Sequence, residues 1–457
     1  MMKRRSMKME NNSKKPSYTN ADDFAVTSVP ENKRKSIFNI TITSCAWIIS
    51  LSTIVTGGAL IQGLNFAHAV LAAVLGMLII AVYGFFQGVM GAKYGISTTV
   101  LARQAFGRYG SGLFGIVLAL TLGIGWFGWQ VAFFGTTISE MFPGVWLAKP
   151  EVAIVWGGML MILTAFIGYR GLAALSFIAV PLVVIFSIWG IVSAVNYSGS
   201  WHNLLTFHPT GDPMTIFAGI TIVVGNAALG AVVFPDVTRY AKGAVSGGIG
   251  ASVGYFLGGV FCLVAGAAMA IAANVPDIGS TPNIPAAMSK LGLGFLAFFI
   301  IVFAQWTTND NNLYTGSLGL RNVVNIPKKA LVAIMGVIGI IIALLGVQNM
   351  FVPFLTFLGL YVPPIAGVMI ADHWITAPVI KKIQYRFGAG TTYSKLNVAA
   401  ILSVIIGGFT ASKVTFGIGP INSTVLAFLI YIVFTFIFTK LNLRYEIGEA
   451  TEESSGF

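Results

Sequence analysis

The sequence predicts an all-α polytopic membrane protein with twelve transmembrane helices. Of its 457 residues, 56% are hydrophobic and only 9% are charged, which is unlike the composition of soluble globular proteins. Apolar stretches of roughly 20 residues, long enough to cross a ~30 Å hydrocarbon layer, recur along most of the chain. Glycine and proline interrupt several stretches, and such breaks are tolerated at membrane depth only beside protein or a water-filled cavity. The functional site is therefore expected inside the membrane.

Polar ends and an apolar middle divide the chain into three segments. Residues 1–36 are polar and basic, residues 37–441 form the predicted twelve-helix domain, and residues 442–457 form a short polar tail, expected in the cytoplasm. The first segment lacks a short apolar core followed by a small-residue cleavage site, so we expect a retained cytoplasmic tail rather than a signal peptide. Cys45 and Cys262 lie in apolar stretches and indicate neither a disulfide nor a metal site.

The predicted spans follow the apolar stretches, with ends defined to within about four residues. They are 38–62, 67–91, 113–141, 151–169, 172–195, 214–238, 246–273, 291–318, 330–347, 351–372, 397–415 and 423–440. Lysine and arginine residues then fall mostly on one side of the membrane. Outside segments carry only Lys149, Lys290 and Lys413 of the 27 basic residues if the N-terminus is cytoplasmic. Because basic residues favour the cytoplasmic side, we expect both termini in the cytoplasm and a multi-pass protein of the cell membrane.

Four predicted spans contain conspicuous interruptions. These are TGG at 56–58, GIGWFG at 123–128, VVGNAALG at 223–230 and VPP at 362–364. The first and third fall in spans 1 and 6, at corresponding places of a five-plus-five arrangement, which is the pattern of an inverted-repeat transporter with its site near the midplane. The alternative is that these glycines only allow helices to pack closely.

The stretch AQWTTNDNN, residues 304–312, places polar residues in the middle of a predicted span. At ~100° per residue, the Ala304 carbonyl and the hydroxyls of Thr307 and Thr308 lie on one face of a helix. Neutral oxygen ligands suit a small hard cation such as sodium. The alternative is that both threonines donate to carbonyls one turn earlier. Asp310 is a candidate proton carrier, because an acid inside the membrane is costly.

The stretch GIGWFGWQ supplies a second candidate surface. Trp126 and Gln130 are four residues apart and share a helix face. An aromatic plane beside a carboxamide suits a flat heterocycle with amide-like edges, whose ring stacks while the amide reads the edge. The alternative is packing or an interfacial position, the commoner role of tryptophan in membranes and the one expected for Trp129.

The remaining polar residues favour structural or gating roles. Asp236 and Arg239 are three residues apart and can pair locally, and Asp372 lies at the cytoplasmic end of a span, where it can lock an inner gate. The four histidines lack metal-ligand spacing, and the chain contains no nucleotide loop or hydrolytic motif. We therefore expect neither an enzyme with catalytic residues nor an ATP-driven pump, and no cofactor besides a coupling cation.

Six motifs in one order resemble the nucleobase:cation symporter family, which includes bacterial cytosine permease. They are TGG at 56–58, GAKYGISTTVLARQAFG at 91–107, GWFG at 125–128, PDVTRY at 235–240, WTTNDNNLYTGSLGL at 306–320 and VPPIAGVMIAD at 362–372. The resemblance implies a LeuT-like fold, with two inverted five-helix repeats followed by two C-terminal helices, that works by alternating access. In sodium-coupled relatives the cation lies between span 1 carbonyls and span 8. This implies a cation site formed by Ala46, Ile49, Ala304, Thr307 and Thr308.

The resemblance also implies a substrate site. Family substrates stack on the span 3 tryptophan, here Trp126. Cytosine permeases have a glutamine, an aromatic residue, a serine and an asparagine where this chain has Gly123, Ala227, Leu229 and Ala304. The pairing of Trp126 with Gln130 instead resembles the hydantoin and purine or allantoin-type branches. The implied substrate-binding residues are Trp126, Gln130, Gly225, Asn226, Ala227, Asn309 and Asn312.

Together these features predict a symporter that imports a nucleobase or related planar heterocycle, coupled to sodium or, alternatively, to protons. The partners expected are the small-molecule substrate and membrane lipid, with neither nucleic acid nor an obligate protein partner. A membrane receptor that binds the ligand without moving it is the rival from another class. It predicts ligand binding without accumulation in vesicles.

Overall fold

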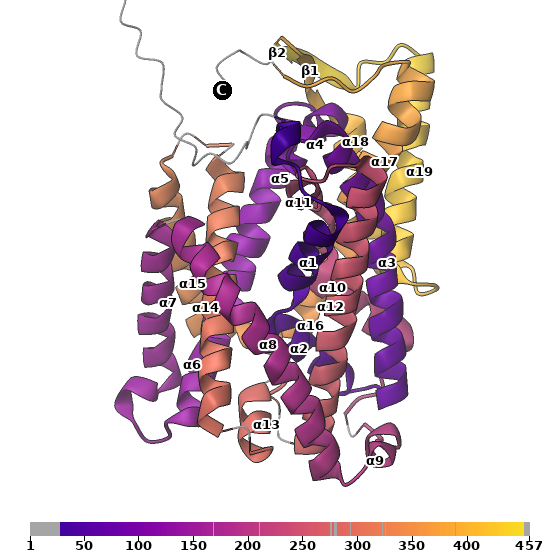
Figure 1. Ribbon diagram of the computed structural model, residues 1–457. Helices are drawn as coiled ribbons and strands as arrows, with labels where there is room; N and C mark the ends of the chain where they lie inside the picture. The colour runs from indigo at the N-terminus through magenta and orange to yellow at the C-terminus, as the bar shows by residue number, and fades with distance from the viewer. Residues whose placement is uncertain are drawn as a thin grey trace, which may run out of the picture.

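Helices make up nearly all of the regular structure, as the ribbon in Figure 1 shows. The computed structural model describes residues 28–451 except 168, 210, 275–276, 278–280, 293, 322, 325 and 389. The first part comprises η1 (Glu31–Lys33), α1 (Ile37–Ile48), α2 (Leu51–Leu60), α3 (Phe66–Tyr94), α4 (Thr98–Phe106), α5 (Gly110–Leu118), η2 (Ala119–Trp126), α6 (Phe127–Met141), η3 (Trp146–Ala148), α7 (Pro150–Ile167), α8 (Tyr169–Ser198) and α9 (Trp201–Leu205).

The second part comprises α10 (Ile216–Val232), α11 (Pro235–Thr238), α12 (Ala244–Ala273), α13 (Ile284–Lys290), α14 (Gly294–Arg321), α15 (Lys328–Leu344), η4 (Val347–Met350), α16 (Phe351–Tyr361), α17 (Pro363–Ala371), η5 (Asp372–Lys381), β1 (Thr392–Asn397), α18 (Val398–Lys413), α19 (Gly419–Lys440) and β2 (Glu446–Thr451). Each predicted span falls on one or more of these helices. Within the described part of the chain, seven helical segments are long and apolar enough to cross a membrane, or eight with the bent pair α1 and α2. The number twelve stays a prediction.

The break in the first span lies elsewhere than predicted. The chain leaves the helix at Ile49 and Ser50, where α1 and α2 meet at a bend of 61°. The TGG motif at 56–58 instead continues α2 without interruption. The position predicted from the glycines was therefore wrong by about two helical turns.

The other interruptions differ in outcome. Span 6 is continuous through residues 223–230, and its break comes later, between α10 and α11 ahead of Pro235. The prediction for 223–230 was therefore wrong. The GIGWFG stretch does lie at an irregularity, because η2 is a π-helix ending at Trp126. VPP at 362–364 does separate two helices, since α16 ends at Tyr361 and α17 begins at Pro363.

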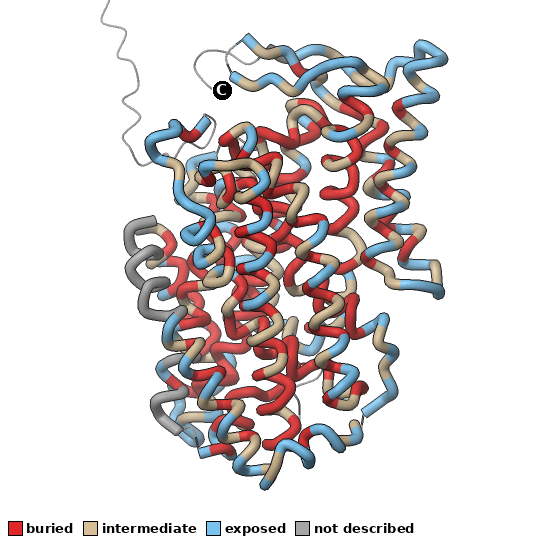
Figure 2. Tube along the Cα trace, turned by 45° about the vertical axis from the view of Figure 1, so that its right-hand side comes forward, coloured by how far each residue is buried: buried red, intermediate tan, exposed pale blue. Residues whose placement is uncertain are grey.

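The misplaced glycines serve close helix packing. A Cβ atom added to Gly57 of α2 would lie 1.9 Å from the carbonyl oxygen of Leu263 in α12, and one added to Gly266 would lie 1.8 Å from the carbonyl oxygen of Ile54. The backbones of α2 and α12 therefore touch from both sides. Figure 2 shows the result, a continuous buried interior along the middle of the molecule.

The end of the molecule drawn at the top of Figure 1 carries a two-stranded sheet that the sequence analysis missed. Strand β2 comes from the predicted C-terminal tail, 442–457, and pairs antiparallel with β1. Beneath the sheet, Asp372 is 1% exposed and accepts hydrogen bonds from Tyr431 at 2.7 Å, Tyr385 at 2.6 Å and Lys381 at 3.3 Å. Lys381 also lies 2.7 Å from Glu446 of β2. The cluster of side chains around Asp372 thus connects η5, α19 and the C-terminal tail.

Part of the predicted N-terminal tail also packs on the bundle. Val29 is buried, and its backbone N–H donates to Gly95 at the end of α3. Lys35 forms a parallel bridge with Ala241, between α11 and α12. Residues 28–36 therefore connect the ends of the second and sixth predicted spans.

The contact between α2 and α12 leads to a stability prediction. Gly57→Ala should lower the free energy of unfolding by about 1–3 kcal/mol, because the added methyl meets backbone that must shift. Gly112→Ala is the control, since its Cβ would meet only a Val323 methyl, at 3.3 Å. Thermal unfolding of the purified protein in detergent measures both. Equal midpoints for the two variants would contradict the packing account.

The Asp372 cluster leads to a second prediction. Asp372→Ala should cost about 3–5 kcal/mol of stability, because Lys381 loses its buried partner and the Tyr385 and Tyr431 hydroxyls lose their acceptor. Glu446→Gln should cost less than about 1 kcal/mol, because the Glu446 side chain is 39% exposed. The double variant Asp372→Ala/Lys381→Met should recover most of the loss. Denaturation midpoints test all three, and no recovery in the double variant would refute the ion-pair explanation.

Candidate functional site

The break between α1 and α2 is held by one threonine. Ile49 and Ser50 both have extended backbone, and the Ser50 hydroxyl accepts a hydrogen bond from the Thr53 backbone N–H. The Thr53 hydroxyl donates to the Ile48 carbonyl at 2.9 Å and lies 3.0 Å from the Ser50 hydroxyl. Because Thr53 is fully buried, these bonds replace water at the helix ends.

The two carbonyls implied for span 1 lie at this break. Ala46 is in the last turn of α1, and Ile49 is the residue that follows the helix. Carbonyls at a helix C-terminus lack N–H partners within that helix and carry the negative end of its dipole. Ala46 and Ile49 therefore lie where backbone oxygen is available to a cation.

On α14, Ala304, Thr307 and Thr308 bring three oxygens together, as their spacing predicted. The hydroxyls of Thr307 and Thr308 donate to the Ala304 carbonyl at 3.1 and 2.8 Å. Both bonds run to a carbonyl one turn earlier, which is the alternative role predicted for these threonines. The same bonds hold the two hydroxyls side by side. Since α14 contacts α2, the threonine face and the break lie on neighbouring helices. Each hydroxyl oxygen keeps lone-pair capacity beyond the bond it donates.

Trp126 is the edge of a buried aromatic cluster. It is 6% exposed and makes edge-to-face contacts with Trp129, Phe354 and Phe351, with ring centroids 5.9, 5.4 and 6.3 Å away. Gln130 lies one turn further along the same helix and is 3% exposed. Both side chains are therefore buried, and their joint contact with a flat ring stays a prediction.

The predicted residues of α10 contact three neighbouring helices. A Cβ added to Gly225 would overlap the Leu355 carbonyl oxygen of α16, so this glycine allows close packing. Asn226 donates from Nδ2 to the Thr53 hydroxyl at 3.1 Å, while its buried Oδ1 has no partner within the described structure. The Ala227 carbonyl accepts a hydrogen bond from Tyr255 at 3.3 Å. Asn226 thus links α10 directly to the α1–α2 break.

The two predicted asparagines of α14 differ in surroundings. Asn309 is fully buried and donates to the Phe127 carbonyl of α6 at 3.2 Å. Asn312 is 8% exposed, and its Nδ2 is a buried donor without a partner among the described residues. Asp310 points toward α7, where it accepts a hydrogen bond from Thr164 at 2.8 Å. Two groups of these asparagines therefore have unmet hydrogen-bonding capacity for a ligand, namely Nδ2 of Asn312 and Oδ1 of Asn309.

Trp129, expected only to pack, connects the aromatic cluster to the segment before α13. It is 1% exposed, stacks on Phe351 with ring centroids 4.4 Å apart, and donates from Nε1 to the Thr281 hydroxyl at 3.3 Å. Thr281 in turn donates to the Gln348 carbonyl at 2.5 Å. The side of the cluster opposite the β-sheet end is therefore covered by a hydrogen-bonded segment.

At the other end, two of the quoted motifs meet. Asp236 of PDVTRY accepts a hydrogen bond from the backbone N–H of Thr98, the first residue of α4, at 2.9 Å. A carboxylate at a helix N-terminus is stabilised by the helix dipole. The Arg239 side chain donates to the backbone carbonyl of Asp236 at 3.1 Å, whereas the predicted local pairing was with the Asp236 carboxylate. The bond to α4 was not predicted.

Sequence comparison assigns the family. Residues 28–447 match the family described as permeases for cytosine/purines, uracil, thiamine and allantoin. The chain belongs to this permease family. The cytosine permease of Escherichia coli strain K12 is 32% identical over 412 residues, covering 90% of this chain and 94% of that protein. The hydantoin permease of Microbacterium maritypicum is 22% identical over 367 residues, covering 74% and 72%.

Solved structures show the fold. The inward-facing conformation of Mhp1 matches with a TM-score of 0.77 at 19% identity, covering 91% of this chain and 93% of that chain. Mhp1 in a closed conformation with bromovinylhydantoin bound matches with a TM-score of 0.72 at 19% identity, covering 96% and 98%. The LeuT-like fold of a multi-pass membrane protein is confirmed. As a permease the chain is a transporter and not an enzyme.

Thr53 and Ser50 are the site residues that sequence reasoning missed. The stretch SLST at 50–53 contains the hydroxyl residues at the spacing of a helix N-cap and its third helical residue. This signal marks the start of a helix, and hence a break, inside an apolar run. Glycine carries no comparable hydrogen-bonding signal. The break predicted from the TGG glycines was therefore placed at the wrong turn of the helix.

The hydroxyl of Thr53 can be tested against a matched neighbour. Thr53→Val should increase amide hydrogen exchange around residues 46–54 at least about tenfold, because unpaired buried groups cost about 1–3 kcal/mol each. Thr56→Val is the control, since the buried Thr56 hydroxyl donates only back to Ser52. Mass spectrometry of exchanged peptides compares them. Equal exchange in the two variants would refute the role assigned to Thr53.

Proposed function

We propose that this permease is a secondary active symporter that imports a planar nucleobase-like heterocycle together with sodium. The observation that supports this most directly is the α1–α2 break, which adjoins α14, the helix that carries the paired threonines. Broken helices that present backbone oxygen near a second helix are how transporters of this architecture hold a coupling ion. The family and the fold support transport, and the ion and substrate are the proposal.

The proposed cation ligands are the carbonyls of Ala46, Ile49 and Ala304 and the hydroxyls of Thr307 and Thr308. All are neutral oxygens, which suits a hard monovalent cation better than a site with carboxylates would. Thr307 and Thr308 are already converged on the Ala304 carbonyl. Binding therefore requires the hydroxyl hydrogens to turn away while their oxygens stay in place, which limits the reorganisation needed.

The proposed substrate lies against Trp126. Its ring would contact the aromatic face, and its polar edge would meet Gln130 together with the unpaired Asn226 Oδ1, Asn309 Oδ1 and Asn312 Nδ2. Buried polar groups without partners are costly, and a ligand that bonds them recovers this cost. A heterocycle that offers both donors and acceptors fits this set. Related permeases are named for cytosine and for hydantoin, both of which are such rings.

Coupling follows from the bond between Asn226 and Thr53. Thr53 holds the backbone beside the proposed cation ligands, and Asn226 adjoins the proposed substrate site. A cation that fixes the break therefore also fixes Asn226. By reciprocity, bound substrate must raise cation affinity by the same factor.

The proposed orientation places the β-sheet end of Figure 1 in the cytoplasm. That end carries Lys381, which lies 2.7 Å from Glu446 of β2, and Lys395, which is part of β1, in agreement with the excess of basic residues on cytoplasmic segments. The segment before α13 then faces outside. Both termini are cytoplasmic in this orientation.

Proton coupling through Asp310 is the alternative within transport. Asp310 is 1% exposed and has a hydroxyl partner, Thr164, but the described residues provide it with no ion pair. Its carboxylate is bonded to Thr164 of α7, whereas the hydroxyls of Thr307 and Thr308 converge on the Ala304 carbonyl. This position favours sodium at the threonine face as the coupling ion.

Uptake into proteoliposomes tests the proposal. Labelled uracil, cytosine, adenine, hypoxanthine, allantoin and hydantoin are each offered with and without an inward sodium gradient. Wild type should accumulate at least one compound only with sodium. Thr308→Ala should weaken sodium dependence at least about tenfold, since losing a bond to a charged group costs about 1.5–3 kcal/mol. Thr43→Ala is the control, because the exposed Thr43 hydroxyl makes a similar local bond, to Asn39.

The alternatives give different outcomes in the same vesicles. Uptake that ignores sodium, follows external pH and disappears in Asp310→Asn would replace sodium with protons. Binding without accumulation of any compound would indicate a receptor. If Thr308→Ala keeps full sodium dependence, the threonine face of α14 does not bind the coupling cation.

A further inference from the structure

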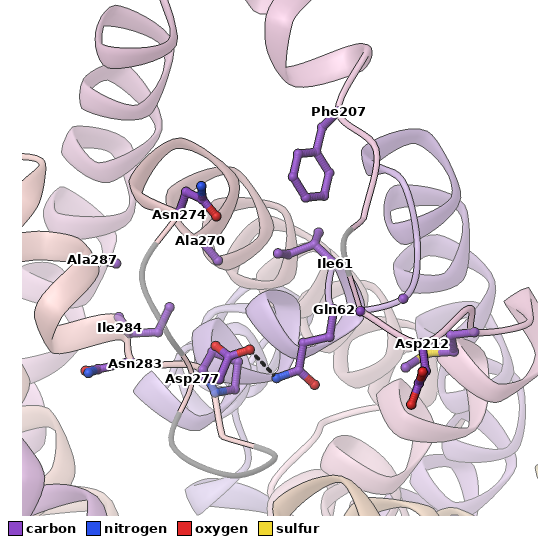
Figure 3. Close-up of a pocket in the computed structure, with 14 residues that line it drawn as sticks. Ile61, Gln62, Phe207, Asp212, Ala270, Asn274, Asp277, Asn283, Ile284 and Ala287 are labelled. Atoms are coloured by element: carbon purple, nitrogen blue, oxygen red, sulfur yellow. Dashed lines mark hydrogen bonds between the residues drawn. The ribbon is translucent and has the colours of Figure 1, made fainter.

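A cavity of about 520 Å³ lies beside the end of α2, on the proposed outer side (Figure 3). Its walls come from four separate segments: the end of α2, the segment between α9 and α10, the end of α12, and α13 with the loop before it. Ligand pockets of proteins are typically about 300–1,000 Å³, so the cavity is large enough for a small heterocycle. None of the residues proposed for the central site lines it.

One wall of the cavity is polar and acidic. Gln62 donates from Nε2 to the Asp277 carboxylate at 2.7 Å, and Asp212 and Asn274 lie nearby on the cavity wall. The fourteen lining residues include two carboxylates and no lysine, arginine or histidine. Partial burial raises the pKa of Asp277, while hydrogen bonds from Gln62 and the Asn283 backbone oppose the shift. The wall therefore attracts hydrogen-bond donors and disfavours anions.

Apolar side chains line the cavity among these polar groups. Phe207, Ile61, Met214 and Ile284 line the same space, and Figure 3 shows Phe207 directed toward it beside Ile61. An aromatic ring offers a face for stacking another flat ring. A flat ring held there would have its edge available to Asp277.

We propose that this cavity is an outer binding site for a planar heterocycle that carries an exocyclic amino group. The amino group donates to the Asp277 carboxylate and the ring packs on Phe207, while the Gln62 amide carbonyl accepts a second donor. Adenine and cytosine have such an amino group, whereas uracil and hydantoin do not. The inference rests on the proposed function, because these compounds belong to the proposed substrate class.

The outer site is separate from the central one. Thr281 bonds to Trp129, while the next residue, Pro282, lines the cavity and packs against Gly58 of α2. One face of this short segment thus covers the aromatic cluster, and the other forms part of the cavity wall. A chain that fills both sites binds two molecules of heterocycle.

Counting sites tests the inference. Equilibrium binding of labelled cytosine and adenine to protein in lipid nanodiscs should give two sites per chain. Trp126→Ala should retain the outer site alone, and Asp277→Asn should weaken that site at least tenfold. Phe207→Ala should weaken it as well. Glu151→Gln removes an exposed acid from the same side of the membrane and should change nothing. Labelled uracil should not bind Trp126→Ala.

Two results would overturn the outer site. One is a single site in wild type that Asp277→Asn and Phe207→Ala leave unchanged. The other is binding to Trp126→Ala that these two substitutions do not weaken. Size-exclusion chromatography identifies variants that fail to fold. If one of Asp277→Asn and Phe207→Ala fails to fold, the other, made in the otherwise wild-type protein, is sufficient for the test. Failure of the proposed function is a separate result, because it appears as absent sodium-driven uptake in wild type.

Discussion

A helix interrupted inside a membrane must find partners for every backbone group that the break releases, and here the hydroxyl of Thr53 meets that requirement. It donates to the last carbonyl of α1, lies within hydrogen-bond distance of the Ser50 cap, and accepts from Asn226 of α10. One O–H donor and two lone pairs are thereby fully used. Because all three partners are fixed together, the break has a defined shape, and it is at this break that we propose the Ala46 and Ile49 oxygens as cation ligands.

Close helix packing holds this arrangement in place. Backbone contacts at Gly57 and Gly266 press α12 against α2, and Gly225 presses α10 against α16. The helix that carries Phe351 and Phe354 therefore touches both Trp126 and the Asn226 region. The proposed cation and substrate sites are joined by packing as well as by the hydrogen bond between Asn226 and Thr53. Small residues suit this role, because association of helices in lipid depends on close packing more than on the hydrophobic effect.

Sequence predicted the apolar spans well, since the length needed to cross a bilayer leaves a strong pattern. It also predicted that Ala304, Thr307 and Thr308 converge, because helical geometry alone determines that face. It misplaced the breaks in spans 1 and 6, since glycine looks the same whether it ends a helix or lets another helix approach. The β2 strand and the partners of Asp372 could not be predicted, because they depend on contacts between segments distant in sequence. Trp129 was assigned to packing alone because nothing near it in sequence indicates Thr281.

The central claim is that cation and heterocycle stabilise the same arrangement around Thr53. The most direct test measures the Kd of the transported heterocycle with and without sodium, and the Kd of sodium with and without that heterocycle. The account predicts that both constants fall by the same factor, at least about fivefold, as a coupling of about 1 kcal/mol requires. A heterocycle Kd that does not change between sodium-free and sodium-saturated protein would contradict it.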